Sequence, residues 1–114
     1  MTDQHLHGKS RANPQAPVTN IVIYIPKEGK EAELLALIRK HEPALRSVDL
    51  VTSDPFRLWK AHDVRKNRDQ FIEQFVWKTG DSSDIAHQTP EVMAVWEPME
   101  SVLEDLMIFE AEPI

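Results

Sequence analysis

The sequence predicts an α+β domain in which helices cover one face of a four-stranded antiparallel sheet. Segments with a two-residue alternation and segments with helical spacing follow each other in the order strand, helix, strand, strand, helix, strand. The two middle strands are joined by a short polar stretch, which is typical of an antiparallel hairpin. A helix after the first strand and another before the last complete a split βαβ, or ferredoxin-like, arrangement.

The ordered domain is expected to span residues 18–114. Residues 1–17 are polar, include two prolines and show no periodicity, so we expect a flexible N-terminal arm. The stretch VTNIVIYIP at residues 18–26 then alternates as the first strand, which is rich in β-branched residues and ends at a proline. Asn20 and Tyr24 lie on one face of this strand, and isoleucines lie on the other.

The first helix is expected within residues 29–48. Leucine and isoleucine side chains recur at helical spacing along one stripe, and His41 lies on the same stripe. Pro43 lacks a backbone N–H, so we expect it to kink or break the helix near Arg39. For His41 we expect a core histidine whose ring is hydrogen-bonded in the interior, and the carbonyl freed by Pro43 is a candidate partner.

A hairpin is expected after this helix. Residues 54–64 and 70–78 alternate as the second and third strands, and the stretch RKNRD at residues 65–69 is a suitable turn. Glu73 and Trp77 share one face of the third strand with two phenylalanines. This face therefore combines a carboxylate with three large aromatic side chains.

Glu73 has two interpretations. If its strand face lines a pocket, burial among aromatic rings would make its carboxylate a stronger base and so a candidate for catalysis. Alternatively, it forms a cross-strand ion pair with Arg57 or Lys60 on the neighbouring strand. Both interpretations stay open at the level of the sequence.

Two further helices and a fourth strand are expected after the hairpin. Ser82 or Ser83 is a suitable N-cap for a short helix, and Thr89 is a suitable N-cap for a longer one with Pro90 at its first position. The longer helix carries a tryptophan on its apolar stripe, and a proline in its last turn is expected to bend it. Residues 105–114 are expected to form the closing strand.

The face of the sheet that the helices leave uncovered carries isoleucine, valine and phenylalanine side chains. One chain cannot shield such an apolar surface, whereas a second copy packed sheet against sheet can do so. We therefore expect a homodimer, and with it a dimeric α/β barrel.

Composition narrows the classes of function. The chain of 114 residues has a formal net charge of −6 and no basic stripe with interleaved aromatic residues, so we expect no nucleic-acid partner. No apolar run approaches the ~20 residues that span a bilayer, and the N-terminus lacks the apolar centre of a signal peptide. We therefore expect a cytoplasmic protein with no membrane partner. The absence of cysteine excludes disulfides and cysteine-based zinc sites, and no spaced cluster of metal ligands is present.

One longer stretch, FVWKTGDSSDIAHQTPEV at residues 75–92, has a distinctive composition. It combines a strand that ends at Trp77, a short helix that ends in Ala-His at His87, and a break at Thr-Pro before a longer helix. This stretch resembles the central motif of the antibiotic biosynthesis monooxygenase-like proteins, which belong to the dimeric α/β-barrel superfamily. The order of the elements extends the resemblance over residues 18–114.

The resemblance implies a cofactor-independent monooxygenase that binds a small aromatic or quinol-like molecule between its sheet and its helices. Oxygenases of this family act on quinols and anthrones without a metal or flavin, because the electron-rich substrate itself reduces dioxygen. Such a site needs aromatic walls, a few polar groups and an acid/base residue. The candidate catalytic residues are His87 and Glu73. The candidate substrate-binding residues are Asn20, Tyr24, Trp77 and Trp96.

Each candidate also has an interpretation without catalysis. His87 suits the C-terminus of a short helix, where its ring bonds a carbonyl and complements the helix dipole. Trp77 and Trp96 suit large core anchors, and Asn20 suits the start of a strand. The alternative function is therefore a non-catalytic dimeric barrel that binds a small molecule or serves in assembly.

Heme degradation is a third and less favoured interpretation. Heme-degrading members of the superfamily use an asparagine on the first strand, a tryptophan at the end of the third, and a histidine on the second long helix. Asn20 and Trp77 match the first two positions, but the histidine position falls near Trp96. We therefore expect no heme and no other cofactor.

Overall fold

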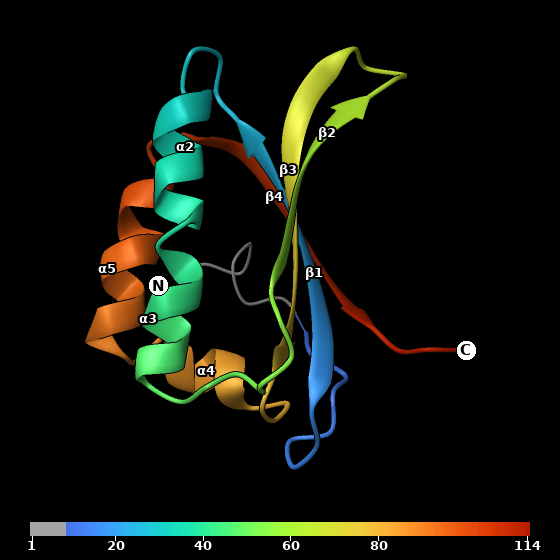
Figure 1. Cartoon of the computed structure of the whole chain (residues 1–114), viewed down its shortest axis with the longest axis vertical. Coiled ribbons are helices and arrows are strands. Elements are labelled where there is room, and N and C mark those ends of the chain that lie inside the picture. Colours follow the sequence, from blue (N-terminus) through green and yellow to red (C-terminus); the bar gives the residue numbers. More distant parts are fainter. Residues whose placement is uncertain (1–8) are drawn as a thin grey trace.

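The structure is a computed structural model that describes residues 9–114. Its elements follow the predicted order, with the first long helix divided into two (Figure 1). The strands are β1 (Val18–Pro26), β2 (Arg57–Asp63), β3 (Arg68–Trp77) and β4 (Leu103–Ala111). The helices are α2 (Glu31–Ile38), α3 (His41–Ser47), α4 (Ser82–Ala86) and α5 (Pro90–Met99).

The four strands form one antiparallel sheet in the order β2-β3-β1-β4. All the helices of residues 9–114 lie on one side of this sheet, and none of them lies on its other side (Figure 1). The predicted α+β class and ferredoxin-like arrangement are therefore confirmed. Within one chain the sheet is open, because β2 and β4 form its two edges.

The predicted break in the first helix is confirmed. Helix α2 ends at Ile38, and α3 begins at His41. Pro43 lies in the first turn of α3, where its missing N–H would have had no partner within the helix. This break turns α3 so that His41 and Leu45 are buried against the sheet.

The helix starts after β3 differ in detail from the prediction. The N-cap of α4 is Asp81, one residue before the serines that we expected. Ser82 instead accepts a hydrogen bond from the backbone N–H of Thr79 and is itself buried. Helix α5 begins at Pro90 as predicted, although the Thr89 hydroxyl donates to the carbonyl of Ile85 instead of capping α5.

The hydrophobic core lies between the helices and the near face of the sheet. Its sheet side consists of alternate residues of β1 and β3, which project toward the helices. Its helix side consists of leucines, isoleucine, valines and methionine from α2, α3 and α5. The buried members include Val22, Tyr24, Leu34, Ile38, Leu45, Phe71, Phe75, Trp77, Val92, Val95 and Met99.

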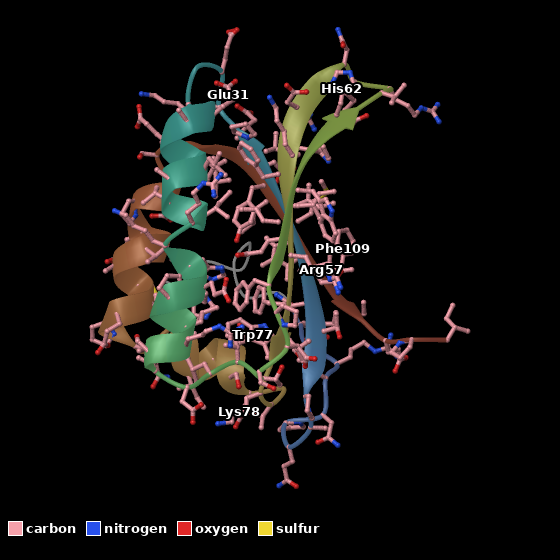
Figure 2. All side chains as sticks on the ribbon, viewed as in Figure 1. Glu31, Arg57, His62, Trp77, Lys78 and Phe109 are labelled. Atoms are coloured by element: carbon pink, nitrogen blue, oxygen red, sulfur yellow. The ribbon has the colours of Figure 1, made fainter. Side chains whose placement is uncertain are left out.

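The far face of the sheet carries large apolar side chains, and no helix of residues 9–114 covers it. Ile21 pairs with Phe109 in the sheet register, so their side chains share this face. Phe109 is 49% exposed and Trp59 is 45% exposed. Figure 2 shows Arg57 and Phe109 on the side of the sheet opposite the helices. We call this surface the open face, and the surface under the helices the covered face.

The described part of the predicted N-terminal arm, residues 9–17, contains neither helix nor strand. It contacts the end of β4 through Glu110 and the loop between β3 and α4 through Gly80. The rest of the predicted arm lies outside the described residues. Among residues 9–114, no helix combines the length and apolarity that crossing a membrane requires.

Candidate functional site

A pocket with a cavity volume of about 580 Å³ lies on the covered face, between the sheet and the helices. Strands β1, β3 and β4 form its floor, and residues from α3, α4 and α5 form its walls. Five of the six candidate residues line it: Asn20, Tyr24, Trp77, His87 and Trp96. A volume of this size is ordinary for a small-molecule site.

Aromatic rings form much of the pocket wall. Phe75 and Trp77 on β3 contact each other edge to face, with ring centroids 4.9 Å apart. Trp96 on α5 lies across from them and contacts the rings of His41 and His87, at centroid distances of 5.8 Å and 4.7 Å. Figure 2 shows Trp77 between the sheet and the helices. The wall therefore suits a flat apolar molecule.

A chain of hydrogen bonds lies beneath these rings. The hydroxyl of Tyr24 donates to Oε1 of Glu73 at 2.6 Å. Nδ1 of His41 lies 2.8 Å from the same oxygen. Nε1 of Trp96 donates to Nε2 of His41 at 2.9 Å. One polar chain thus joins β1, β3, α3 and α5 through Tyr24, Glu73, His41 and Trp96.

The partners of His41 fix its tautomer in this arrangement. An indole N–H can only donate, so Nε2 of His41 must accept and carries no proton. The ring proton therefore lies on Nδ1, from which it is donated to Glu73. One oxygen of the Glu73 carboxylate accepts two hydrogen bonds, which hold the carboxylate in a single orientation.

Glu73 itself lies just behind the pocket wall. It is 2% exposed, and it reaches the pocket only through its partners Tyr24 and His41, which both line it. The alternative ion pairs do not form: Arg57 lies opposite Gln74 on the open face, and the Lys60 ammonium lies 3.6 Å from Asp69. The interior position of Glu73 thus follows from its alternation with Phe71 and Phe75 along β3.

Tyr24 is protonated over the ordinary range of pH. Burial raises the pKa of its hydroxyl well above its usual value near 10, and the negative charge and the hydrogen bond of Glu73 raise this pKa further. The hydroxyl of Tyr24 therefore donates to Glu73, and Tyr24 is also one of the residues that line the pocket.

His87 makes the helix-end contact that its position in the sequence allowed, and it also lines the pocket. It is the C-cap of α4, and its Nδ1 lies 2.8 Å from the carbonyl oxygen of Ser83, one turn earlier. This is the helix-end contact that a histidine without a catalytic role would make. The same ring also packs against Trp96 and lines the pocket.

Asn20 lies on the pocket floor toward the end of β4. It pairs with Phe75 on one side and with Glu110 on the other, and it is 5% exposed. Its amide offers both a donor and an acceptor to a bound molecule. Glu110 also lines the pocket, together with Ser10 and Arg11 of the N-terminal segment.

The sequence analysis did not name His41 among the site residues. His41 is 2% exposed and fully hydrogen-bonded, as expected for a core histidine, but its partners are Glu73 and Trp96 and not the carbonyl freed by Pro43. The sequence contains one signal for this pair, because His41 and Glu73 both fall on positions that face the core. Two such polar groups need partners when buried, and each is the other's natural partner.

The residues of the pocket do not suit an axial heme ligand at the expected position. The matching residue is Trp96, whose indole nitrogen carries a proton and has no lone pair in the ring plane to offer a metal. It already donates to His41. Among residues 9–114, no group of three or more acidic or histidine side chains is placed to hold a metal ion.

The fold was compared with solved structures. A protein described as an antibiotic biosynthesis monooxygenase matches with a TM-score of 0.65 and 15% identity, covering 85% of this chain and 98% of its own. A variant of SnoaB, a cofactor-independent oxygenase from Streptomyces nogalater, matches with a TM-score of 0.64 and 14% identity, over 86% and 95% of the two chains. A dimeric protein of unknown function with a ferredoxin-like fold, from Bacteroides fragilis, matches with a TM-score of 0.60 and 12% identity, over 85% and 96%.

These similarities show that the chain has an antibiotic biosynthesis monooxygenase-like fold. At such identities they show the fold and leave the activity to be argued from the site. No protein-family model matches the sequence. No curated protein matches it either.

Proposed function

We propose that this protein is a cofactor-independent monooxygenase that acts on a small aromatic or quinol-like substrate. The observation that carries the proposal is the hydrogen-bonded chain of Tyr24, Glu73, His41 and Trp96 beneath an aromatic pocket. Oxygenation without a cofactor requires removal of a proton from an electron-rich ring and a place for that proton to go. The hydrogen-bonded side chains of Tyr24 and Glu73 supply both a group that removes the proton and a group that receives it.

The pocket supports binding of a flat ring. Trp77 and Phe75 offer aromatic surface from the sheet, and Trp96 offers it from α5. Between these rings, a substrate hydroxyl is placed to donate to the oxygen of Tyr24, and the amide of Asn20 is placed to hold a second polar group. The remaining lining combines apolar side chains, such as Val22 and Leu106, with charged side chains, such as Glu97 and Glu110.

Tyr24 then passes the substrate proton to Glu73. As the substrate hydroxyl gives its proton to the Tyr24 oxygen, the proton of Tyr24 moves along its 2.6 Å hydrogen bond to the carboxylate. Because the pKa of Tyr24 is raised, the tyrosinate does not accumulate, and Tyr24 takes up the substrate proton as it gives its own to Glu73. His41 is a positioning residue in this step, since its Nδ1–H keeps the accepting oxygen in place.

The redox step needs only dioxygen, and the reacting carbon is the methylene between the aromatic rings of an anthrone. In the enol form of the anthrone one hydrogen of this methylene has moved to the ring oxygen, and the resulting hydroxyl is the group that gives its proton to Tyr24. The substrate anion gives one electron to dioxygen, and the resulting radical and superoxide combine to form a carbon–oxygen bond. The peroxide then loses water as its oxygen–oxygen bond breaks and the second carbon-bound hydrogen leaves as a proton. The methylene becomes a carbonyl, and dioxygen supplies one atom to the product and one to water.

His87 remains a candidate catalytic residue in this proposal. Its ring lines the pocket on the side of Trp96 and is held by the carbonyl of Ser83. Imidazole is a common acid/base group in enzymes, which supports a role of His87 in proton transfer with a bound substrate.

Oxygen uptake tests the proposal. Wild-type protein with a panel of hydroquinones and anthrones should consume dioxygen faster than buffer does. Tyr24→Phe and Glu73→Gln should each lower the rate about 10²-fold or more, because each removes a group that moves the proton. His87→Ala should lower it to a smaller extent.

Matched controls separate the site from the rest of the molecule. Glu104→Gln changes an exposed carboxylate of β4, and His62→Ala changes an exposed histidine of the hairpin, so both should keep the wild-type rate. If no compound in the panel is consumed faster than in buffer, or if the Tyr24 and Glu73 variants behave like these controls, the oxygenase proposal is wrong.

A non-catalytic binding protein is the second candidate. The observation that favours it is that the polar atoms of Tyr24, Glu73, His41 and Trp96 already have partners within the protein. Such a network of hydrogen bonds stabilises the interior of the protein without any substrate. Tight binding of 2-naphthol, a flat phenol, combined with no oxygen uptake across the panel would select this candidate.

We further propose that two chains form a dimer through their open faces. Phe109 and Trp59 leave large apolar surfaces exposed there, and the Bacteroides fragilis protein of similar fold is described as dimeric. Light scattering after gel filtration should give twice the mass of one chain. Phe109→Glu should give a monomer, whereas Val64→Glu, on the exposed hairpin turn, should stay dimeric. A monomeric wild type at micromolar concentration would contradict the dimer.

A further inference from the structure

The N-terminal segment before β1 forms part of the pocket wall. Lys9, Ser10 and Arg11 line the cavity beside the end of β4. These residues precede the first strand and belong to none of the elements of the ferredoxin-like fold. The pocket is therefore bounded in part by a segment that the fold itself does not require.

The first anchor of this segment is Glu110 on β4. The hydroxyl of Ser10 donates to one oxygen of the Glu110 carboxylate, and the backbone N–H of Arg11 donates to the other at 2.9 Å. Glu110 lies directly opposite Asn20 in the sheet register. The anchor thus holds the segment beside the residue at the end of the pocket floor.

The second anchor is Gly80 in the loop between β3 and α4. Its backbone N–H donates to the carbonyl oxygen of Asn13 at 3.0 Å. A Cβ atom placed on Gly80 would overlap that same oxygen and also meet Ala12. The backbone of Gly80 is outside the left-handed region, so glycine is needed here for the close approach and not for its conformational freedom.

We propose that residues 9–13 are a strap that completes the ligand site, held closed by Glu110 and Gly80. The strap shields one side of the pocket from water and limits the size of the molecule that fits. It shares with the proposed function the premise that the pocket binds a flat aromatic ligand, but it does not depend on oxygen chemistry. Because only a few hydrogen bonds hold it, the strap opens to admit a ligand and closes over it.

Limited trypsin digestion measures the opening of the strap. The bond after Arg11 lies between the two anchors, and the bond after Lys66, in the exposed hairpin turn, serves as an internal control. Gly80→Ala should speed cleavage after Arg11 about tenfold, because it expels the Asn13 carbonyl and removes a hydrogen bond. Glu110→Ala should do so about fivefold to tenfold, since it removes the acceptor of two others.

The control variant is Glu104→Ala, which removes an exposed carboxylate from the same strand and should leave cleavage after Arg11 unchanged. Cleavage after Lys66 should be the same in all four proteins. If neither Gly80→Ala nor Glu110→Ala speeds cleavage after Arg11, the two anchors do not hold the segment and the proposal of a strap is wrong.

Binding of 2-naphthol then tests the link between the strap and the pocket. Saturating 2-naphthol should slow cleavage after Arg11 in the wild type and leave cleavage after Lys66 unaffected. The two anchor variants should bind 2-naphthol several-fold more weakly, whereas Glu104→Ala should bind it normally. The proposal of a strap is overturned if the wild type does not bind 2-naphthol, or if the anchor variants bind it as tightly as the wild type does. It is also overturned if 2-naphthol leaves cleavage of the wild type after Arg11 unaltered.

Neither readout involves oxygen consumption. The strap can therefore fail while oxygen uptake is observed, which would leave the proposed oxygenase intact. Equally, ligand-dependent protection of Arg11 without any oxygen uptake would support the strap and favour the non-catalytic binding protein.

Discussion

The two faces of the sheet differ in what they bury and what they expose. The covered face hides polar groups: Glu73 and His41 are each 2% exposed and are hydrogen-bonded within the interior. The open face does the opposite and leaves Trp59 and Phe109 about half exposed. Both arrangements have a cost for a folded chain, because buried polar groups and exposed aromatic groups are each unfavourable unless something compensates.

The comparison indicates where each function lies. On the covered face the cost is offset by mutual hydrogen bonds, so that face can hold reactive groups at fixed positions beside a pocket. On the open face, no described residue offsets the cost of exposing aromatic side chains to water. This supports a role of the open face in assembly. We therefore propose that chemistry takes place on the covered face and association on the open face.

Truncating one phenylalanine on each face should show the largest contrast. Phe75 is 1% exposed and packs against Trp77, whereas Phe109 is 49% exposed. Phe75→Ala should lower the free energy of unfolding by about 3 to 5 kcal/mol, as for other buried aromatic residues. Phe109→Ala should lower it by about 1 kcal/mol or less in dilute monomer, where little apolar contact is lost. Urea unfolding measures both, and similar losses would abolish the contrast between the faces.

Removing the Glu73 carboxylate should have the next largest effect. Glu73→Ala leaves the Tyr24 hydroxyl and the His41 N–H buried without their acceptor, which should cost about 2 to 4 kcal/mol. Glu104→Ala, the matched change on exposed β4, should cost less than about 0.5 kcal/mol. If Glu73→Ala matches this control in urea unfolding, the hydrogen bonds of Glu73 contribute nothing to the stability of the folded protein.

Alkaline pH should reveal the burial of Tyr24. Its folded pKa is raised by burial and by Glu73, so the folded state keeps a proton that the unfolded chain loses above pH ~10. Its contribution to stability is therefore complete below that pH and is lost as the pH rises toward the folded pKa. Between pH ~10 and ~11, the wild type should lose about 1 kcal/mol more stability than Tyr24→Phe does. Parallel curves would place the Tyr24 hydroxyl in water.

The exposed pair of His62 and Asp69 should have the smallest effect. Nδ1 of His62 lies 2.9 Å from the Asp69 carboxylate, and both side chains are about half exposed. Surface pairs contribute at most about 1 kcal/mol and often nothing measurable, so His62→Ala should change the free energy of unfolding by less than about 0.5 kcal/mol. A larger loss would mean that the hairpin contacts something that one chain does not contain.

The element order could be predicted from the sequence because its signals are local. Two-residue alternation identified the strands, and Pro43 and Pro90 located a helix break and a helix start. The covered face of β3 followed from the alternation of Phe71, Glu73 and Phe75. The N-cap of α4 was misplaced by one residue, because an aspartate and two serines in succession all suit that role.

Contacts between distant segments were beyond the sequence. His41 and Glu73 lie 32 residues apart, and no local pattern joins a helix start to the middle of a strand. The strap was missed for the same reason, since Ser10 and Glu110 are 100 residues apart and meet only after the sheet has formed. Composition marks residues 1–17 as polar, but it carries no information on which surface residues 10–13 contact.

Turnover under ¹⁸O-labelled dioxygen tests the central assignment, that the covered face is an oxygenase site, most directly. Wild-type protein is supplied with an anthrone in unlabelled water, and the product is reduced at once so that its carbonyl cannot exchange with solvent. Mass spectrometry should show one labelled oxygen atom per product molecule. The wild type should form this product faster than buffer does, and Glu73→Gln should form it about 10²-fold more slowly than the wild type or at the rate in buffer. Product without the label, or product formed no faster than in buffer, would contradict the account.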